Sequence, residues 1–181
     1  MRLSGVLAGA LALAIGMAAS SARVQAQAGG ADATIASVKA MYEGVKGYII
    51  KAAAMVPEDK YKYQPTKEVR TMGQLFGHIA NANGMICGAA SGLKPAAAGD
   101  AEKLATKAEI EKALAASFAF CDQAFKAVTA ANANESVTLF GQTHTRVGAL
   151  AFNNAHDFEH YGNIVTYMRI NGMVPPSSGG K

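Results

Sequence analysis

The residues with the clearest chemical potential are two histidines near the C-terminus, in the stretch His156-Asp157-Phe158-Glu159-His160. An α-helix advances about 100° and 1.5 Å per residue, so residues four apart lie about 40° apart around the axis and one turn along it. Two imidazoles placed in this way can bind one metal ion from the same helix face. A third histidine, His78, lies in another segment with helical periodicity. The pattern therefore predicts a three-histidine metal site inside a helical bundle.

Polar residues accompany these histidines at positions where a plain bundle would carry leucine or isoleucine. Asn153, Asn163 and Tyr167 fall in the same sector of about 100° as the C-terminal histidines, and Gln74 lies one turn before His78. Burying polar groups costs free energy unless they are satisfied. A metal ion beside a water-filled pocket would satisfy them, and so would a network of side-chain hydrogen bonds. These four residues are the candidates to contact a substrate or to orient the histidine rings.

Other potential ligands are poorly placed, and other metal motifs do not fit. His144 lies twelve residues before His156, and Cys87 falls on the face of its helix opposite His78. Asp157 and Glu159 flank the histidine sector. The spacing also resembles that of zincin proteases, but that motif needs a sheet beside the helix and usually a later ligand, and no His, Asp or Glu follows His160. The Glu-x-x-His pairs of di-iron bundles do not occur.

The elements that must position these residues are helices. Apolar residues recur at steps of three and four in four segments, at about residues 32–55, 71–88, 106–128 and 145–170. No segment is a convincing strand, although residues 136–140 could be briefly extended. The link over residues 91–105 is longer than is usual between neighbouring antiparallel helices. We therefore expect an all-α fold, a four-helix bundle with a long crossover connection.

The N-terminus has the layout of a secretory signal peptide. A short basic start with Arg2 precedes an apolar run from Gly5 to Ala19, and Ala26-Gln27-Ala28 is a small-x-small cleavage pattern. We expect residues 1–28 to be removed, so that no stable membrane anchor remains. The protein would then be exported, either to the periplasm or into the medium. The mature chain would consist of a domain at 29–176 and a disordered tail at 177–181. The leader holds two of the 17 basic residues and no acid, so its removal lowers the net charge from +4 to +2.

The net charge is small, and the sequence has no stripe of arginine or lysine with interleaved aromatic residues. Nucleic acid is therefore not an expected partner. Exposed apolar helix faces are compatible with a homodimer, and a small-molecule ligand or substrate is the other partner considered. The two cysteines, Cys87 and Cys121, could form a disulfide in an exported protein, but a buried free thiol is equally consistent with their spacing.

Two stretches resemble the DinB/YfiT-like superfamily, a family of metalloenzyme-like proteins. They are RTMGQLFGHIA at residues 70–80 and HDFEHYGNIVTYMR at residues 156–169, and the closing NGMVPP at 171–176 fits as well. The resemblance covers essentially the whole mature domain. It implies a four-helix bundle with a crossover and a divalent metal held by one histidine of the second helix and two of the fourth. Those roles map onto His78, His156 and His160.

Three neutral imidazoles leave one to three positions of an ion open for water or substrate. We therefore expect a metal-dependent hydrolase or thiol transferase, and its catalytic residues are not identified by the sequence. Some relatives transfer intracellular thiols, which would not obviously be available to an exported protein. The alternative is a non-catalytic exported bundle that binds a metal or a small ligand. Imidazole suits Zn, Ni, Cu and Fe alike, so the sequence indicates a divalent transition metal without its identity.

Overall fold

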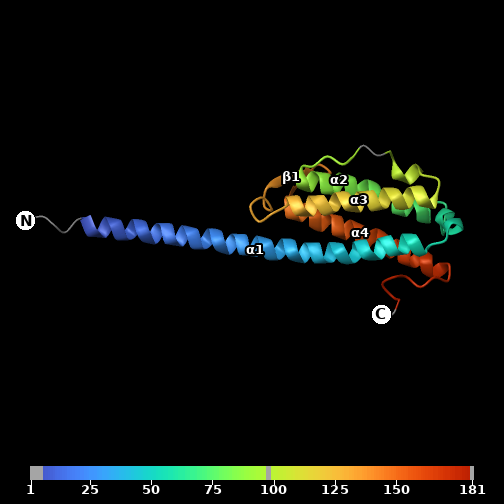
Figure 1. Cartoon of the computed structure of the whole chain (residues 1–181), viewed down its shortest axis with the longest axis horizontal. Coiled ribbons are helices and arrows are strands. Elements are labelled where there is room, and N and C mark those ends of the chain that lie inside the picture. The colour runs from blue at the N-terminus through green and yellow to red at the C-terminus, as the bar shows by residue number, and fades with distance from the viewer. Residues whose placement is uncertain (1–5, 97–98, 180–181) are drawn as a thin grey trace, which may run out of the picture.

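The computed structural model describes residues 6–96 and 99–179, with side chains from residue 29 onward. It contains four α-helices: α1 (Val6–Met55), α2 (Met72–Ser91), α3 (Lys107–Ala127) and α4 (Arg146–Ile170). The short helical turns η1 (Glu58–Lys62) and η2 (Ala101–Lys103) lie in the links between them. Figure 1 shows the four helices side by side, which confirms the expected all-α four-helix bundle.

The helix ends follow local signals in the sequence. At the start of α2, the Thr71 side chain accepts a hydrogen bond from the Gln74 backbone nitrogen, and the Gln74 side chain accepts one from the Thr71 backbone. Thr106 and Glu109 form the same capping box at the start of α3. Such reciprocal bonds satisfy backbone donors that have no partner inside the helix. Gly92 ends α2 with a φ of 76°, a conformation that glycine adopts without steric cost.

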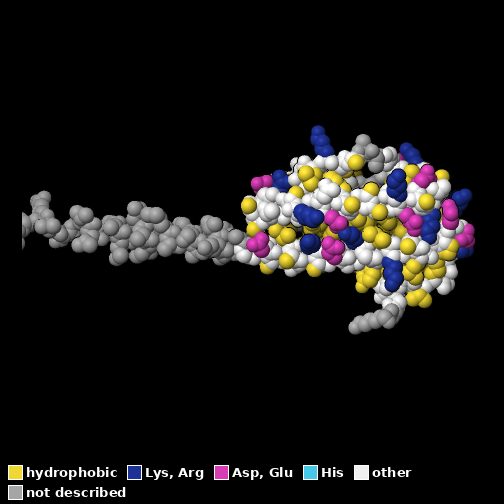
Figure 2. All heavy atoms as spheres, in the orientation of Figure 1, with side chains coloured by type: hydrophobic (Ala, Val, Ile, Leu, Met, Phe, Trp, Pro, Cys, Tyr) yellow, Lys and Arg dark blue, Asp and Glu magenta, His cyan; other side chains and the backbone are white. Residues whose placement is uncertain are grey.

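Helix α2 lies at the centre of the arrangement. It packs against α3 and α4, and α1 packs against α4 and α3. The predicted apolar stripe of the first helix is confirmed, because Tyr42, Val45, Ile49 and Ala52 are all buried in the core. On the face that Figure 2 shows, basic and acidic side chains are interspersed. The crossover between α2 and α3 places η2 directly against α2.

Gly77 permits this close contact between α2 and the crossover. A Cβ atom at this position would fall 2.8 Å from the backbone nitrogen of Glu102, which is too close for any side chain.

The first helix is longer than expected. It begins at Val6 rather than near Asp32, and Figure 1 shows its N-terminal part extending beyond the other helices. Residues 1–5 of the expected signal peptide lie outside the described residues. Helical backbone over the rest of that segment does not test whether it is cleaved, so the leader stays a prediction. None of the helices in the described part of the chain combines the length and the hydrophobicity that a bilayer-spanning segment requires.

A small hairpin accompanies the helices. Its first strand lies where brief extension was expected, and the second strand was not predicted. Strand β1 (Ser136–Leu139) pairs with β2 (Gln142–Thr145) in antiparallel register. The two residues between them, Phe140 and Gly141, have φ values of 50° and 75°. Positive φ at both central positions is the geometry of the two-residue turns that match strand twist. Phenylalanine rarely adopts it, which is why the turn carries no clear sequence signal.

A disulfide connects Cys87 of α2 to Cys121 of α3, with 5.3 Å between their Cα atoms. Both residues are fully buried. This resolves the two alternatives that the sequence left open, since the described chain contains no free cysteine. The bond lies on the side of α2 that faces α3, away from the histidines.

Two residues at the start of the tail expected at 177–181 contact α4. The Tyr161 hydroxyl donates to the Ser177 hydroxyl and accepts from the Ser177 backbone nitrogen. Arg169 donates to the Ser178 hydroxyl. These bonds hold the segment after Pro176 against α4, and residues 180–181 lie outside the described part of the chain.

Candidate metal centre

The structure brings the three predicted histidines together. His78 comes from α2, and His156 and His160 come from successive turns of α4. The Nε2 atom of His156 lies 3.2 Å from that of His78 and 3.1 Å from that of His160. Their potential ligand atoms all lie within 4.8 Å of one another. The three imidazole rings, contributed by two helices, therefore converge on one point.

These distances match those of a metal site. With metal–nitrogen bonds of about 2.0–2.1 Å, neighbouring histidine ligands lie about 2.9–3.4 Å apart for bond angles between 90° and the tetrahedral value. The tautomer of His78 also suits an ion. A neutral imidazole has one N–H donor and one lone pair. His78 donates through Nδ1 to Glu102, so its Nε2 atom carries a lone pair directed at His156. The residues present thus fit a divalent cation.

The electrostatic environment keeps the two α4 histidines neutral. Burial, followed by the neighbouring His160 and His78, lowers the pKa of His156 to about 4. Burial and His78 also lower the pKa of His160 to about 4, with a contribution from Arg70. Neutral imidazole is the form that binds metal, because the lone pair on Nε2 must be free.

The structure adds one residue that the sequence analysis missed. Glu102, in η2 of the crossover, accepts a hydrogen bond from Nδ1 of His78 at 2.7 Å. Its other carboxylate oxygen accepts from Nε of Arg70 at 2.9 Å. Burial on its own would raise the pKa of Glu102, but the bonds from Arg70 and His78 outweigh it and lower that pKa below the usual range. The ionised carboxylate fixes the tautomer and the orientation of the His78 ring.

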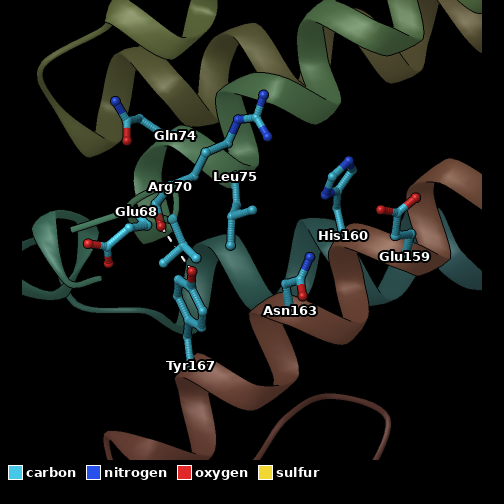
Figure 3. A pocket seen from close by; sticks show the side chains of 9 residues that line it. Glu68, Arg70, Gln74, Leu75, Glu159, His160, Asn163 and Tyr167 are labelled. Carbon is cyan, nitrogen blue, oxygen red and sulfur yellow. Dashed lines mark hydrogen bonds between the residues drawn. The ribbon is translucent and has the colours of Figure 1, made fainter. Parts of the chain in front are cut away.

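A cavity of about 540 Å³ opens beside His160. Figure 3 shows it between α4 and the segment that leads into α2, with His160, Asn163 and Tyr167 along one side of α4. The Tyr167 hydroxyl donates to the backbone oxygen of Arg70 at 3.0 Å, which joins the two walls. The remaining lining residues are Glu68, Val69, Arg70, Gln74, Leu75 and Glu159. A small molecule in this space would contact the histidine centre from one side.

Three of the four polar residues singled out in the sequence line this cavity, namely Gln74, Asn163 and Tyr167. The fourth, Asn153, lies elsewhere. It is fully buried and donates to Oδ1 of Asn83 at 3.0 Å and to Oδ2 of Asp157 at 3.2 Å. Asn153 therefore belongs to a hydrogen-bond network in the core between α2 and α4.

The flanking acids of the histidine motif separate into two environments. Asp157, which flanks the histidine sector, is fully buried, and burial raises its pKa well above the usual range. Glu159 is exposed and lines the cavity beside His160. His144 lies in β2, where its ring contacts Phe152, and is not part of the histidine cluster.

Comparison with known proteins places this geometry in a family. A family model described as DinB superfamily matches residues 41–164, which include all three histidines, and the chain belongs to this superfamily. No curated protein sequence matches the chain.

Solved structures of DinB-like proteins share the fold. A DinB-like protein from Bacillus cereus ATCC 10987 superposes with a TM-score of 0.68 at 15% sequence identity, over 80% of this chain and 95% of that one. A DinB-like protein from Bacillus subtilis gives a TM-score of 0.57 at 16% identity, over 76% of this chain and 93% of that one. At these identities the likeness shows the fold alone.

Proposed function

We propose that this member of the DinB superfamily binds one divalent transition-metal ion, such as Zn, Ni or Fe, through His78, His156 and His160, and acts as a metal-dependent enzyme on a small molecule held in the adjacent cavity. The observation that carries the proposal is the convergence of three imidazoles, with Nε2 of His156 at 3.2 Å from that of His78 and 3.1 Å from that of His160, beside a cavity of about 540 Å³. Three histidine ligands leave room on the ion for a further ligand, as in catalytic rather than structural sites.

An ion in this position would supply Lewis acidity, polarising a substrate carbonyl or making water or a thiol more acidic. The residues around the ion would orient the ligands and the substrate and accept protons. Glu102 holds the His78 ring in its ligating orientation. Glu159 and Glu68 bring carboxylates to the cavity, where either could accept a proton from the nucleophile. Asn163 and Gln74 supply amide groups that could orient a substrate.

Hydrolysis is the reaction class we favour, and thiol transfer is the second. The two cavity carboxylates provide the proton acceptors that the histidine stripe itself lacks. We also propose that the protein is exported. Its N-terminus has the layout of an export signal, and its buried disulfide is typical of proteins in oxidising compartments. Export would separate the protein from intracellular thiols. Cell fractionation with an antibody to the protein tests the location, and a cytoplasmic pool of full-length chain would contradict it.

Metal analysis of the purified protein tests the centre. Wild-type protein should contain about one equivalent of a transition metal, and His78→Ala and His160→Ala should each lose it. His144→Ala is the matched control, because this histidine lies outside the cluster. Absence of metal in the wild type, together with no uptake of added Zn²⁺ or Ni²⁺, would overturn the proposal.

The alternative of a non-catalytic metal-binding bundle is separated by a second comparison. A screen of esters, amides and thiol acceptors should reveal turnover in the metal-loaded wild type. His156→Ala should abolish this turnover while the helical content measured by circular dichroism stays largely intact. A large loss of melting temperature on metal removal, without turnover of any substrate class, would favour the non-catalytic bundle.

A further inference from the structure

We propose that the cavity beside His160 selects small molecules that carry a single carboxylate group, and that Arg70 is the residue that recognises this group. The inference rests on the metal centre proposed above and names the substrate class of that site. It follows from how Arg70 is held, where it lies and which charges surround it.

Arg70 is fixed at both ends of the residue. Its backbone oxygen accepts the Tyr167 hydroxyl at 3.0 Å, and its Nε atom donates to Glu102 at 2.9 Å. Within the described part of the chain, neither terminal nitrogen of the guanidinium has a hydrogen-bond partner. Arginine presents its donors in a planar fork that matches the two oxygens of a carboxylate. Arg70 is therefore a positioned cation with donors to spare.

The location of Arg70 directs these donors to the proposed site. Arg70 and His160 line the same cavity, and Figure 3 shows the Arg70 side chain extending past Leu75 on the side where His160 lies. A ligand between Arg70 and the histidine centre would thus face positive charge at both ends once the ion is bound. This arrangement favours an anionic group at the Arg70 end.

The acidic residues of the cavity limit how much negative charge it accepts. Glu68 and Glu159 line it together with Arg70, and Glu102 already pairs with the Nε side of the guanidinium. A second carboxylate on the ligand would meet these like charges without a second arginine to compensate it. The surroundings therefore favour one carboxylate over two.

A binding experiment on the Co²⁺-loaded protein tests this inference without relying on turnover. The probes are 3-mercaptopropionate, its uncharged amide 3-mercaptopropionamide, and mercaptosuccinate, which carries two carboxylates. The sulfur of each probe reports contact with the cobalt through a change in its absorption spectrum. The wild type should bind 3-mercaptopropionate at least about tenfold more tightly than the amide, the range expected for a charge-assisted bidentate pair. Mercaptosuccinate should bind no more tightly than 3-mercaptopropionate.

Variants distinguish recognition by Arg70 from a merely structural role. Arg70→Gln should remove the preference for 3-mercaptopropionate while leaving affinity for the amide unchanged. Arg169→Gln is the matched control, because Arg169 bonds to Ser178 near the end of α4 and does not line the cavity. It should keep the preference of the wild type.

The failures of the two proposals look different. Protein that takes up no cobalt would contradict the metal centre itself. Cobalt-loaded wild type that binds the acid and the amide equally well would overturn only the role of Arg70. Equal weakening of both probes by Arg70→Gln would also overturn it, because the preference for the carboxylate would then survive without the arginine. Tighter binding of mercaptosuccinate would contradict the limit to one carboxylate.

Discussion

Glu102 accepts a hydrogen bond from Nδ1 of His78 at 2.7 Å, although the two residues lie 24 positions apart on different elements. The contact places the His78 proton on Nδ1 and leaves the Nε2 lone pair directed at His156. Carboxylates in this position orient ligating histidines and raise their basicity. The crossover thus takes part in the centre without supplying a ligand.

Replacing Glu102 with glutamine should weaken metal binding. The neutral amide keeps the size of the side chain but loses the charge that stabilises the Nδ1–H tautomer. We expect affinity for Zn²⁺ to fall by about 10–100-fold, measured by competition with a chromophoric chelator. Glu58→Gln, at an exposed position in η1, is the control. An unchanged affinity in Glu102→Gln would show that His78 needs no orientation by the crossover.

Gly77→Ala should damage both the fold and the centre. Glycine-to-alanine changes inside helices usually stabilise by about 0.5–1 kcal/mol, but the new Cβ here would collide with the backbone of Ala101 and Glu102. The crossover would have to move away from α2 and take Glu102 with it. We expect a lower midpoint of urea unfolding and weaker Zn²⁺ binding. Gly84→Ala on the same helix meets only Pro95 at 3.8 Å, and it should be neutral or stabilising.

The disulfide should contribute a large part of the stability. It closes a loop with a sequence separation of 34, for which the loss of chain entropy in the unfolded state corresponds to about 3–4 kcal/mol. The double variant Cys87→Ala with Cys121→Ala should therefore unfold at a clearly lower urea concentration than the oxidised wild type. Reduced wild type should resemble the variant. Equal midpoints for all three proteins would show that the bond adds no stability.

Stability should decline at alkaline pH because of buried tyrosines. Burial, with a hydrogen bond to Asp122 next in size, raises the pKa of Tyr42 above its ordinary value of 10. At alkaline pH the folded state therefore keeps the proton while the unfolded state loses it. The contribution of Tyr42 to the free energy of unfolding is fully present below pH 10 and is lost as the pH rises beyond it. Burial raises the pKa of Tyr61 in the same direction.

Tyr42→Phe tests this dependence. At neutral pH the variant should lose about 1 kcal/mol, since the single hydroxyl proton has two acceptors within reach, a carboxylate oxygen of Asp122 and the Phe118 carbonyl. Between pH 9 and 11 it should lose less stability than the wild type. Tyr48→Phe, at a partly exposed tyrosine that stacks on Tyr161, controls for loss of a hydroxyl. Parallel pH curves for wild type and Tyr42→Phe would contradict the assignment.

The sequence was sufficient where structure depends on local signals. The helix starts at Thr71 and Thr106 follow from capping boxes, and the buried stripes follow from helical periodicity. The spacing of His156 and His160 likewise fixes their common face. Glu102 could not be predicted in this way, because it lies in an irregular link and meets His78 only after the crossover folds onto α2.

The polar stripe of α4 shows a second limit. One sector of about 100° contains both Asn153 and Asn163, yet Asn153 meets Asn83 in the core while Asn163 lines the cavity. Helical periodicity predicts which side of the helix a residue faces. It does not predict which residue of a neighbouring helix it contacts at each turn. Only the packing of α2 against α4 separates the two amides.

The position of α2 has a consequence for the order in which the chain is constrained. The disulfide ties α2 to α3 covalently, and an ion at the histidines would tie α2 to α4 across a sequence separation of 78. Helix α2 would then be the shared anchor of two cross-links of different chemistry, one controlled by redox conditions and one by metal supply. In a compartment that provides oxidant before metal, α2 and α3 would be cross-linked covalently before an ion connects α2 to α4.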